Sequence, residues 1–381
     1  MSVYRTIGFY CEDGRFSGPQ RFILNLAEKL KDDGYPVVIL IPRLESGHVQ
    51  STLMDKSLPY RLINLTRPSK RPMLLMKYCC FFFNEIETVV SIIKKEKIKI
   101  LYVVGGIWQY KGIIAAILAG SKVMWRFNDV SVSPLFRYIH AIFARHIDLH
   151  IFNGYSVYNY YKDLIMFGKY EIIQSPVDTN YFVNINPNYT RKNLNITLIS
   201  NLNPLKGVEY FVKMAAILGR RYPSLSFYVA GQPLSSQKKY IRYIHHVAEK
   251  ENADIKFLGY VKDIKGLLEK TDIYVCASIT EASPNSVWEA MAMSVPVVAT
   301  DVGDIGRIAV DGEDILIVEP GNVAEMVIKV ERLILDANLR KKIGLNGRKK
   351  VETVLDIEMI KDVHLRMLEN IDESVSHNGC L

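Results

Sequence analysis

Short apolar segments alternate with helical segments along almost all of this 381-residue chain. Such alternation is typical of α/β folds whose strands pair in parallel. It stops once, at the polar, turn-rich segment Asn184–Asn195, which is the best candidate for a linker. Since a chain of this length is too long for one compact core, we expect two Rossmann-like domains at 1–185 and 196–355. A linker at 186–195 and a last helix with a tail at 356–381 complete this division.

Composition indicates a globular protein of a reducing compartment. Hydrophobic residues make up 49% and charged residues 23%. The N-terminus lacks the apolar core of a signal peptide, and the apolar run Met73–Phe83 is shorter than the ~20 residues of a spanning helix. The five cysteines show no C-x-x-C spacing, as expected of reduced thiols. We therefore expect a cytoplasmic location.

Positive charge is concentrated in the first half of the chain. Residues 1–185 contain 23 Lys and Arg against 15 Asp and Glu, whereas residues 186–381 contain 25 of each. The excess favours an acidic partner for the first half: nucleic acid, an anionic membrane surface or an anionic substrate. An incidentally basic surface is the alternative.

The segment Pro72–Asn84 is strongly apolar and follows Arg67, Lys70 and Arg71. A basic lead-in to an apolar helix is typical of contact with an anionic membrane surface. The alternative is a helix buried against the sheet of the first domain. About half of these residues must be buried in this way. We expect peripheral attachment to a membrane.

The stretch Glu281–Gly303 is the most informative part of the sequence for function. Glu281 follows a buried strand, Ile273–Ala277, and Glu289 lies inside a helix that begins near Pro284. The backbone amides of Asn285, Ser286 and Val287 would open this helix and bind an anion there. Because a carboxylate accepts two hydrogen bonds from a diol, the arrangement suits a nucleotide-sugar.

Glu281 to Glu289, followed by Ala-Met-Ala-Met and Pro-Val-Val-Ala-Thr-Asp-Val-Gly, resembles the signature of glycosyltransferase family 4. This resemblance implies retaining enzymes of the GT-B fold, in which two facing Rossmann-like domains form a cleft. It also implies that the last helix crosses back onto the first domain.

The resemblance assigns roles to particular residues. Lys206 would hold the donor diphosphate, Glu281 the sugar hydroxyls and Glu289 the ribose diol. Asn128, at the end of the strand Lys122–Phe127, would lie at the catalytic centre together with Lys206 and Glu281. Further donor-binding residues are expected at Gly18, Asn201, Gly259, Tyr260, Val261, Ser283, Pro284, Asn285 and Ser286. Arg126 and Asp129 are expected on the acceptor side.

Several positions depart from the family pattern. Asn201 stands where an arginine is usual, and Asn128 stands where a histidine is usual. The expected glycine pair after the first strand is Ser17-Gly18. Asparagine cannot exchange a proton near neutral pH, although it can hydrogen-bond a phosphate or a sugar hydroxyl. Asn201, Asn128 and Asp304, which stands where a second glycine is usual, motivate the alternative of a non-catalytic subunit with the same fold.

We therefore predict a retaining hexosyltransferase that moves a sugar from a UDP- or GDP-linked donor to a glycan or lipid-linked acceptor. The predicted place is the cytoplasmic membrane face, in polysaccharide or glycolipid biosynthesis. No cofactor or metal is expected, because the sequence has no Asp-x-Asp motif, and no nucleic acid partner is expected. A nucleotide-sugar epimerase or a phosphorylase, which use the same fold, is a lesser alternative.

Overall fold

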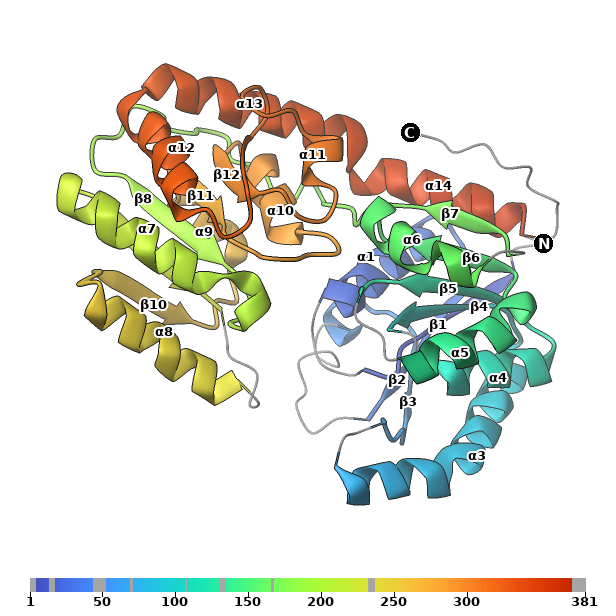
Figure 1. The fold of residues 1–381 in the computed structure, drawn as a ribbon. Helices are drawn as coiled ribbons and strands as arrows, with labels where there is room; N and C mark the ends of the chain where they lie inside the picture. Colours follow the sequence, from blue (N-terminus) through green and yellow to red (C-terminus); the bar gives the residue numbers. More distant parts are fainter. Residues whose placement is uncertain are drawn as a thin grey trace. The chain divides into compact units, whose positions relative to one another are not determined.

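Two parallel sheets with helices on their faces organise the chain (Figure 1). The computed structural model describes residues 5–13, 18–43, 53–68, 71–106, 108–130, 134–165, 168–231 and 237–371. The chain divides into a first unit of residues 1–175 and 360–381 and a second unit of residues 176–359. The predicted pair of α/β domains with parallel sheets is thus confirmed. The segment predicted as the linker, 186–195, belongs to the second unit.

In the described part of the first unit, seven parallel strands pair in the order β3-β2-β1-β4-β5-β6-β7. The chain runs outward from β1 to β3, returns to the middle at β4, and then runs outward the other way. The strands are β1 (Thr6–Tyr10), β2 (Val37–Pro42), β3 (Tyr60–Ile63), β4 (Ile98–Gly105), β5 (Lys122–Phe127), β6 (Leu149–Phe152) and β7 (Tyr170–Ile172). The helices are α1 (Gly18–Asp32), α3 (Pro72–Lys95), α4 (Tyr110–Ala119), α5 (Pro134–Phe143) and α6 (Tyr155–Tyr161).

The last helix, α14 (Ile357–Glu369), packs on the first unit from Ile360 onward, as predicted. Ile360, Met367 and Leu368 are buried in the same core as residues of β1, β2 and α1. The Tyr102 hydroxyl of β4 lies 3.0 Å from Nε2 of His364. This helix therefore forms part of the first unit's core rather than a loose tail.

In the described part of the second unit, six parallel strands pair in the order β10-β9-β8-β11-β12-β13. The strands are β8 (Asn195–Ile199), β9 (Ser226–Ala230), β10 (Ile255–Gly259), β11 (Ile273–Cys276), β12 (Val297–Thr300) and β13 (Leu316–Val318). The helices are α7 (Val208–Arg221), α8 (Lys238–Lys250), α9 (Ile264–Glu269), α10 (Asn285–Ala292), α11 (Ile305–Ile308), α12 (Val323–Leu335) and α13 (Ala337–Val354). The strand order reverses between β8 and β11. Ligands of parallel sheets bind beyond the carboxyl ends of the strands at such a reversal.

Candidate functional site

The loops after β8 and β11 bring two predicted site residues into contact. Lys206 ends a short 3-10 turn, Pro204–Lys206, and its Nζ lies 2.5 Å from Oε1 of Glu281. Ser278 donates a hydrogen bond to the same oxygen at 2.9 Å. The Thr300 hydroxyl holds this loop by donating to the Ser278 carbonyl at 2.6 Å. A cation and a carboxylate are therefore fixed side by side at the strand-order reversal.

Gly207 allows this close approach. Its φ is +57°, and a Cβ added there would lie 2.0 Å from the carbonyl oxygen of Ala277, directly after β11. No side chain fits at that distance, and L residues rarely adopt this backbone conformation. Glycine at 207 thus allows the Lys206 turn to lie against the end of β11.

The N-terminus of α10 differs from the sequence expectation. Asn285 N donates to the Ser283 carbonyl at 3.0 Å, and Val287 N donates to the Pro284 carbonyl at 2.8 Å. Two of the three amides expected to be open are therefore occupied, because the first turn bends tightly around the N-cap Pro284. Ser286 is the remaining one, and its hydroxyl accepts a hydrogen bond from Tyr274 at 2.7 Å.

The other predicted donor-binding residues lie on loops, on helices and at the end of β10 in the same unit, with one exception. Glu289 is buried on α10, with 7% of its surface exposed. Asn201 is exposed two residues after the end of β8, and Tyr260 is exposed directly after β10. Gly259 has a φ of +66° and Val261 is half-buried. The exception is Gly18, the first residue of α1 in the first unit, while its neighbour Ser17 lies outside the described residues.

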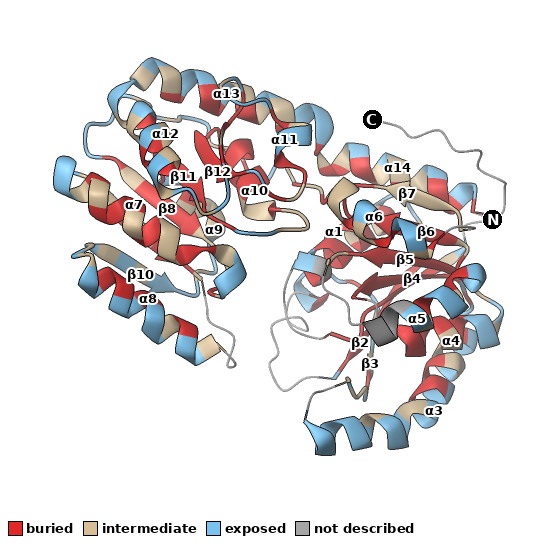
Figure 2. Ribbon diagram, viewed as in Figure 1, coloured by how far each residue is buried: buried red, intermediate tan, exposed pale blue. Residues whose placement is uncertain are grey.

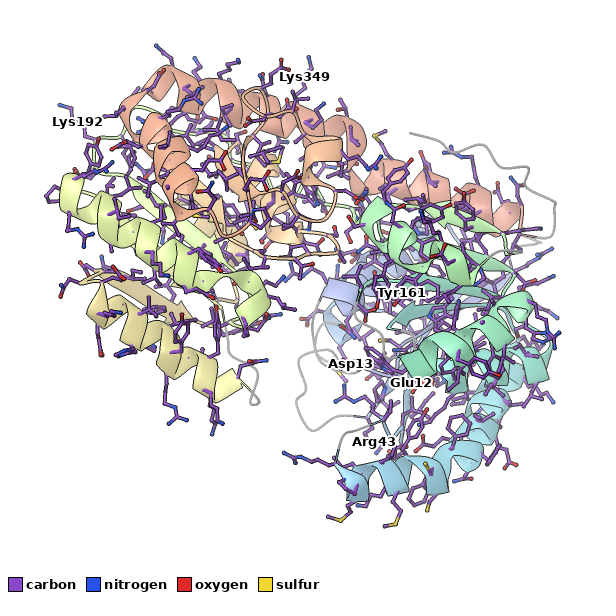
Figure 3. All side chains as sticks on the ribbon, in the orientation of Figure 1. Glu12, Asp13, Arg43, Tyr161, Lys192 and Lys349 are labelled. Atoms are coloured by element: carbon purple, nitrogen blue, oxygen red, sulfur yellow. The ribbon has the colours of Figure 1, made fainter. Side chains whose placement is uncertain are left out.

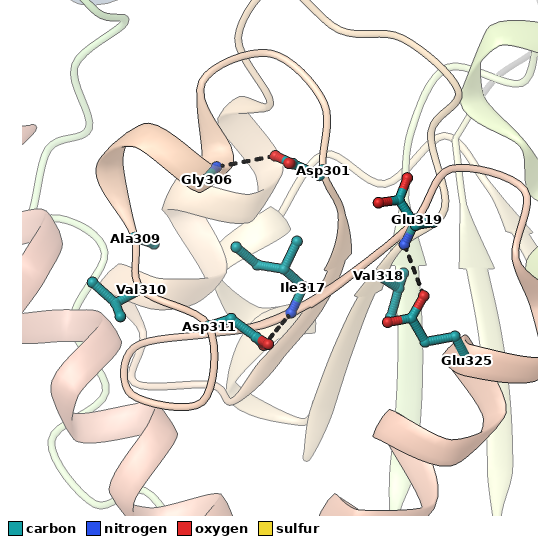
Figure 4. A pocket seen from close by; sticks show the side chains of 9 residues that line it. All are labelled: Asp301, Gly306, Ala309, Val310, Asp311, Ile317, Val318, Glu319 and Glu325. Atoms are coloured by element: carbon teal, nitrogen blue, oxygen red, sulfur yellow. Dashed lines mark hydrogen bonds between the residues drawn. The ribbon is translucent and has the colours of Figure 1, made fainter.

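A hollow of about 390 Å³ lies beyond β12 and β13 (Figure 4). Four carboxylates line it: Asp301, Asp311, Glu319 and Glu325. Asp301 accepts a hydrogen bond from Gly306 N at 3.2 Å, and Asp311 is paired with Lys329 at 2.8 Å. Carboxylates repel phosphate and accept hydrogen bonds from hydroxyls, so this hollow suits a neutral group with hydroxyls better than a phosphate.

In the first unit, Arg126 has a different position from the one expected. The sequence indicated a charge available to an acceptor, but Arg126 is fully buried. Its Nη2 donates to Asn153 Oδ1 at 2.9 Å and to the Ile173 carbonyl at 3.0 Å, while its Nε donates to Asn128 Oδ1 at 3.3 Å. Strand alternation turns residue 126 toward α1, where its guanidinium lies 4.3 Å from the Phe22 ring. Arg126 therefore organises Asn128 instead of forming a surface charge.

Asp129 accepts a hydrogen bond from the Tyr161 hydroxyl at 3.1 Å (Tyr161 is labelled in Figure 3). Burial raises the pKa of Asp129 from 3.8 to about 6, and the bond from Tyr161 opposes this shift. Asp129 thus keeps a proton at mildly acidic pH, unlike an exposed aspartate.

A buried polar cluster that the sequence analysis missed lies where the first sheet reverses its strand order. Glu12 follows β1 (Figure 3), and its backbone N donates to Gln109 Oε1 at 2.7 Å. Burial raises the pKa of Glu12 to about 8, against the attraction of Lys111. Lys111 is itself paired with Glu85 of α3. The signal in the sequence was a carboxylate close to the end of the first strand. Two other residues near strand ends were also missed: Ser278 as a partner of Glu281, and Asn153 as a partner of Arg126.

The first half of α3 is largely exposed and apolar (Figure 2). Met73, Met76 and Phe83 expose 66%, 61% and 74% of their surface, and the first buried residue of the helix is Glu85. Lys70 of the basic lead-in lies outside the described residues. No helix in the described ranges has the length and apolar character needed to cross a bilayer. In the same ranges, no three or more His, Cys, Asp or Glu side chains are grouped so as to hold a metal ion.

Comparison with known proteins adds independent findings. The family model described as Glycosyltransferase Family 4 matches residues 16–181, and the model described as Glycosyl transferases group 1 matches residues 193–336. The chain is 26% identical over 196 residues to the capsular polysaccharide biosynthesis glycosyltransferase CapM of Staphylococcus aureus. That match covers 51% of this chain and 50% of CapM, so it spans only half the length of this relative.

Two longer likenesses cover nearly the whole chain. An uncharacterized glycosyltransferase of Haemophilus influenzae is 22% identical over 349 residues, which is 88% of this chain and 92% of the relative. The crystal structure of Anabaena HepE in complex with UDP and glucose matches with a TM-score of 0.82 and 18% identity. It covers 96% of this chain and 99% of that chain, and at this identity it supports the fold alone. The two family models, which together match residues 16–181 and 193–336, show that this chain belongs to the glycosyltransferases of family 4 and group 1.

Proposed function

We propose that this protein is a retaining hexosyltransferase that uses a UDP- or GDP-linked sugar and needs no metal. The contact between Lys206 and Glu281 at the strand-order reversal of the second sheet carries the proposal. The ammonium of Lys206, held against the loop that leads into α10, suits a departing diphosphate. A carboxylate held by Ser278 suits the hydroxyls of the sugar next to that diphosphate.

The residues would divide the work as follows. The bond between the sugar carbon and the diphosphate oxygen breaks, and a bond to the acceptor oxygen forms on the same face of the sugar. Lys206 and the Ser286 amide would stabilise the charge that develops on the diphosphate, whose oxygen takes the acceptor's proton. Glu289 would hold the ribose diol, and Asn128 would hold a sugar oxygen. The protein's task is then positioning and leaving-group stabilisation.

A thermal-shift screen with UDP- and GDP-linked sugars tests the donor. A ligand at a hundred times its Kd adds about 2.7 kcal/mol to the free energy of unfolding. Release of the nucleoside diphosphate then distinguishes an enzyme from the alternative of a non-catalytic subunit, which would bind without turnover. NMR of the transferred anomeric proton decides retention, and an epimerised nucleotide-sugar would instead indicate the epimerase alternative. A protein stabilised by none of these nucleotide-sugars contradicts the proposal.

The acceptor that we propose is a glycan or lipid-linked sugar at the cytoplasmic membrane face, in polysaccharide or glycolipid biosynthesis. The role in capsular polysaccharide biosynthesis that CapM's name states supports this class of acceptor. The exposed apolar half of α3, with Arg71 at its N-terminus and Lys77 on it, supports an anionic membrane surface as a partner. Attachment would be peripheral.

A further inference from the structure

Arg126 is a buried cation whose hydrogen-bond partners, within the described part of the chain, are all neutral. None of its surface is exposed. It donates hydrogen bonds to two asparagine side chains and one carbonyl group, lies against the Phe22 ring and interacts with the hydroxyl of Tyr102. A buried charge is usually paired with an opposite charge. A guanidinium that has no carboxylate partner among the described residues, at the carboxyl ends of β5 and β6, therefore indicates more than packing.

The contact with Asn128 fixes the orientation of that amide. A guanidinium only donates hydrogen bonds, so the atom of Asn128 that lies 3.3 Å from Nε must be the carbonyl oxygen. The Asn128 NH2 group then points away from Arg126. Its Nδ2 is buried and has no hydrogen-bond partner among the described residues.

The same guanidinium also holds Asn153, whose Oδ1 accepts from both Arg126 and the Ser175 hydroxyl at 2.9 Å. Residues at the ends of neighbouring strands are thereby fixed around one side chain. Rotating the Asn128 amide would place its NH2 against a cation and break this arrangement. The orientation of Asn128 is thus determined by Arg126.

We propose that Arg126 is a positioning residue that locks the Asn128 amide so that its NH2 group donates a hydrogen bond to a sugar oxygen of the substrate. This inference rests on the proposed function. It assigns to Asn128 a fixed donor role, whereas a histidine at this position can donate, accept or carry a charge. The first unit would therefore recognise an oxygen that accepts a hydrogen bond.

The substitution Asn128→Asp tests this orientation because it is isosteric. It leaves an oxygen facing Arg126 and replaces the NH2 group that points away from Arg126 by a second oxygen. We expect the introduced carboxyl group to titrate well below an ordinary aspartate in carbon-detected NMR, and the melting temperature at pH 7 to stay equal or rise. We also expect kcat for release of UDP from UDP-glucose, or of GDP from GDP-mannose if the screen selects GDP, to fall at least tenfold. A purely structural role predicts unchanged turnover in this equally stable variant.

Two further variants complete the test. Arg126→Lys should lower kcat more than it changes the donor KM, because an ammonium lacks the planar set of N–H donors that binds both asparagines. Asn252→Asp, at an exposed turn of the second unit, is the matched control and should leave turnover unchanged. An active wild type with an equally active Asn128→Asp variant, or an introduced carboxyl with an ordinary pKa, overturns this inference alone. A wild type that turns over no nucleotide-sugar overturns the proposed function, and the substrate role of Asn128 falls with it.

Discussion

Nζ of Lys206 lies 2.5 Å from Oε1 of Glu281, so the cation proposed for the diphosphate and the carboxylate proposed for the sugar are hydrogen-bonded to each other. Binding of a nucleotide-sugar must redistribute this contact: Lys206 would turn to phosphate oxygens, and Glu281 would turn to hydroxyls. Ser278 also donates to Glu281 and would anchor one carboxylate oxygen during that exchange.

Removing the charge of Lys206 and removing that of Glu281 should have different effects on the affinities for UDP and for the nucleotide-sugar. Lys206→Met should weaken UDP binding about 10- to 100-fold, because a hydrogen bond to a charged group contributes about 1.5–3 kcal/mol. Glu281→Gln frees Lys206 and should leave UDP affinity equal or higher, while affinity for the nucleotide-sugar falls. Calorimetric titration measures both affinities, with Lys349→Met at an exposed position as the charge control. If each variant changed its affinities for UDP and for the nucleotide-sugar by the same factor, the assigned roles would be contradicted.

Gly207→Ala should displace the Lys206 turn, because the new Cβ would lie 2.0 Å from the Ala277 carbonyl oxygen. We expect a loss of about 1–3 kcal/mol in the free energy of unfolding from backbone strain alone, and a further loss of donor affinity. Gly312→Ala is the matched control, since its φ is +78° but no atom lies within 4 Å of the added Cβ. Equal donor affinity in both variants would mean that the turn does not depend on this contact. Chemical denaturation and calorimetry provide the two measurements.

Transfer should persist in EDTA. Lys206 and the α10 N-terminus would supply the positive charge that a metal ion supplies in other glycosyltransferases. The rate of UDP or GDP release before and after chelation checks this expectation, with readdition of Mg²⁺ and Mn²⁺ as the control. A strict requirement for either ion would rule out the proposed mechanism.

Sedimentation with anionic vesicles tests the membrane surface. Wild type should bind at low salt and be released only in part at high salt, because basic residues contribute ~1 kcal/mol each and apolar burial is insensitive to screening. The double variant Met76→Ser and Phe83→Ser should bind vesicles more weakly at an unchanged melting temperature, since both side chains are more than half exposed. Leu335→Ser, at 69% exposure in the second unit, is the matched control. Arg67 is less suitable, because it is paired with Asp13 at 2.9 Å.

If wild type ignores anionic vesicles, the membrane proposal fails and a soluble acceptor becomes the better hypothesis. If Leu335→Ser loses binding as strongly as the α3 variant, the contact is not specific to α3.

The stability of the first unit should depend on pH through Asp129. Burial raises the pKa of Asp129 from 3.8 to about 6, so the unfolded chain loses this proton first as the pH rises. The associated stability is present below pH 4 and is lost as the pH rises through 6, by roughly 2–3 kcal/mol. Asp129→Asn keeps an acceptor for Tyr161 and removes the titration. Its free energy of unfolding should therefore exceed that of wild type above pH 6 and match it near pH 4.

Denaturant unfolding at several pH values measures this difference. Tyr161→Phe should act in the opposite direction at pH 7, because it removes the hydrogen bond that favours the charged carboxylate. A difference between Asp129→Asn and wild type that does not vary with pH would contradict the raised pKa.

The architecture could be predicted from the sequence because buried parallel strands are nearly continuous apolar runs. The loop–helix segment from Glu281 to Glu289 could be placed because its residues follow a strand and precede a helix. The contact of Lys206 with Glu281 could not be predicted, since it depends on the backbone of Gly207 and on two side-chain rotamers.

The burial of Arg126 could have been predicted only by considering which face of the strand it lies on. In Trp125-Arg126-Phe127 the charge suggested exposure, but the face toward α1 is covered by Phe22. The number of open backbone amides at the N-terminus of α10 was overestimated, because the sequence does not reveal the tight first turn at Pro284. About half of the apolar run of α3 was expected to be buried, whereas the first buried residue of this helix is Glu85.

Because α14 completes the core of the first unit, that unit is discontinuous in the chain. During synthesis the whole second unit leaves the ribosome before Ile360, Met367 and Leu368 reach their places beside β1, β2 and α1. The first unit therefore waits, with part of its apolar surface open, until residues 360–371 have been synthesised. A fragment that stops at Ser175 lacks this part of its core, and an isolated first unit should carry residues 360–371 joined to its C-terminus.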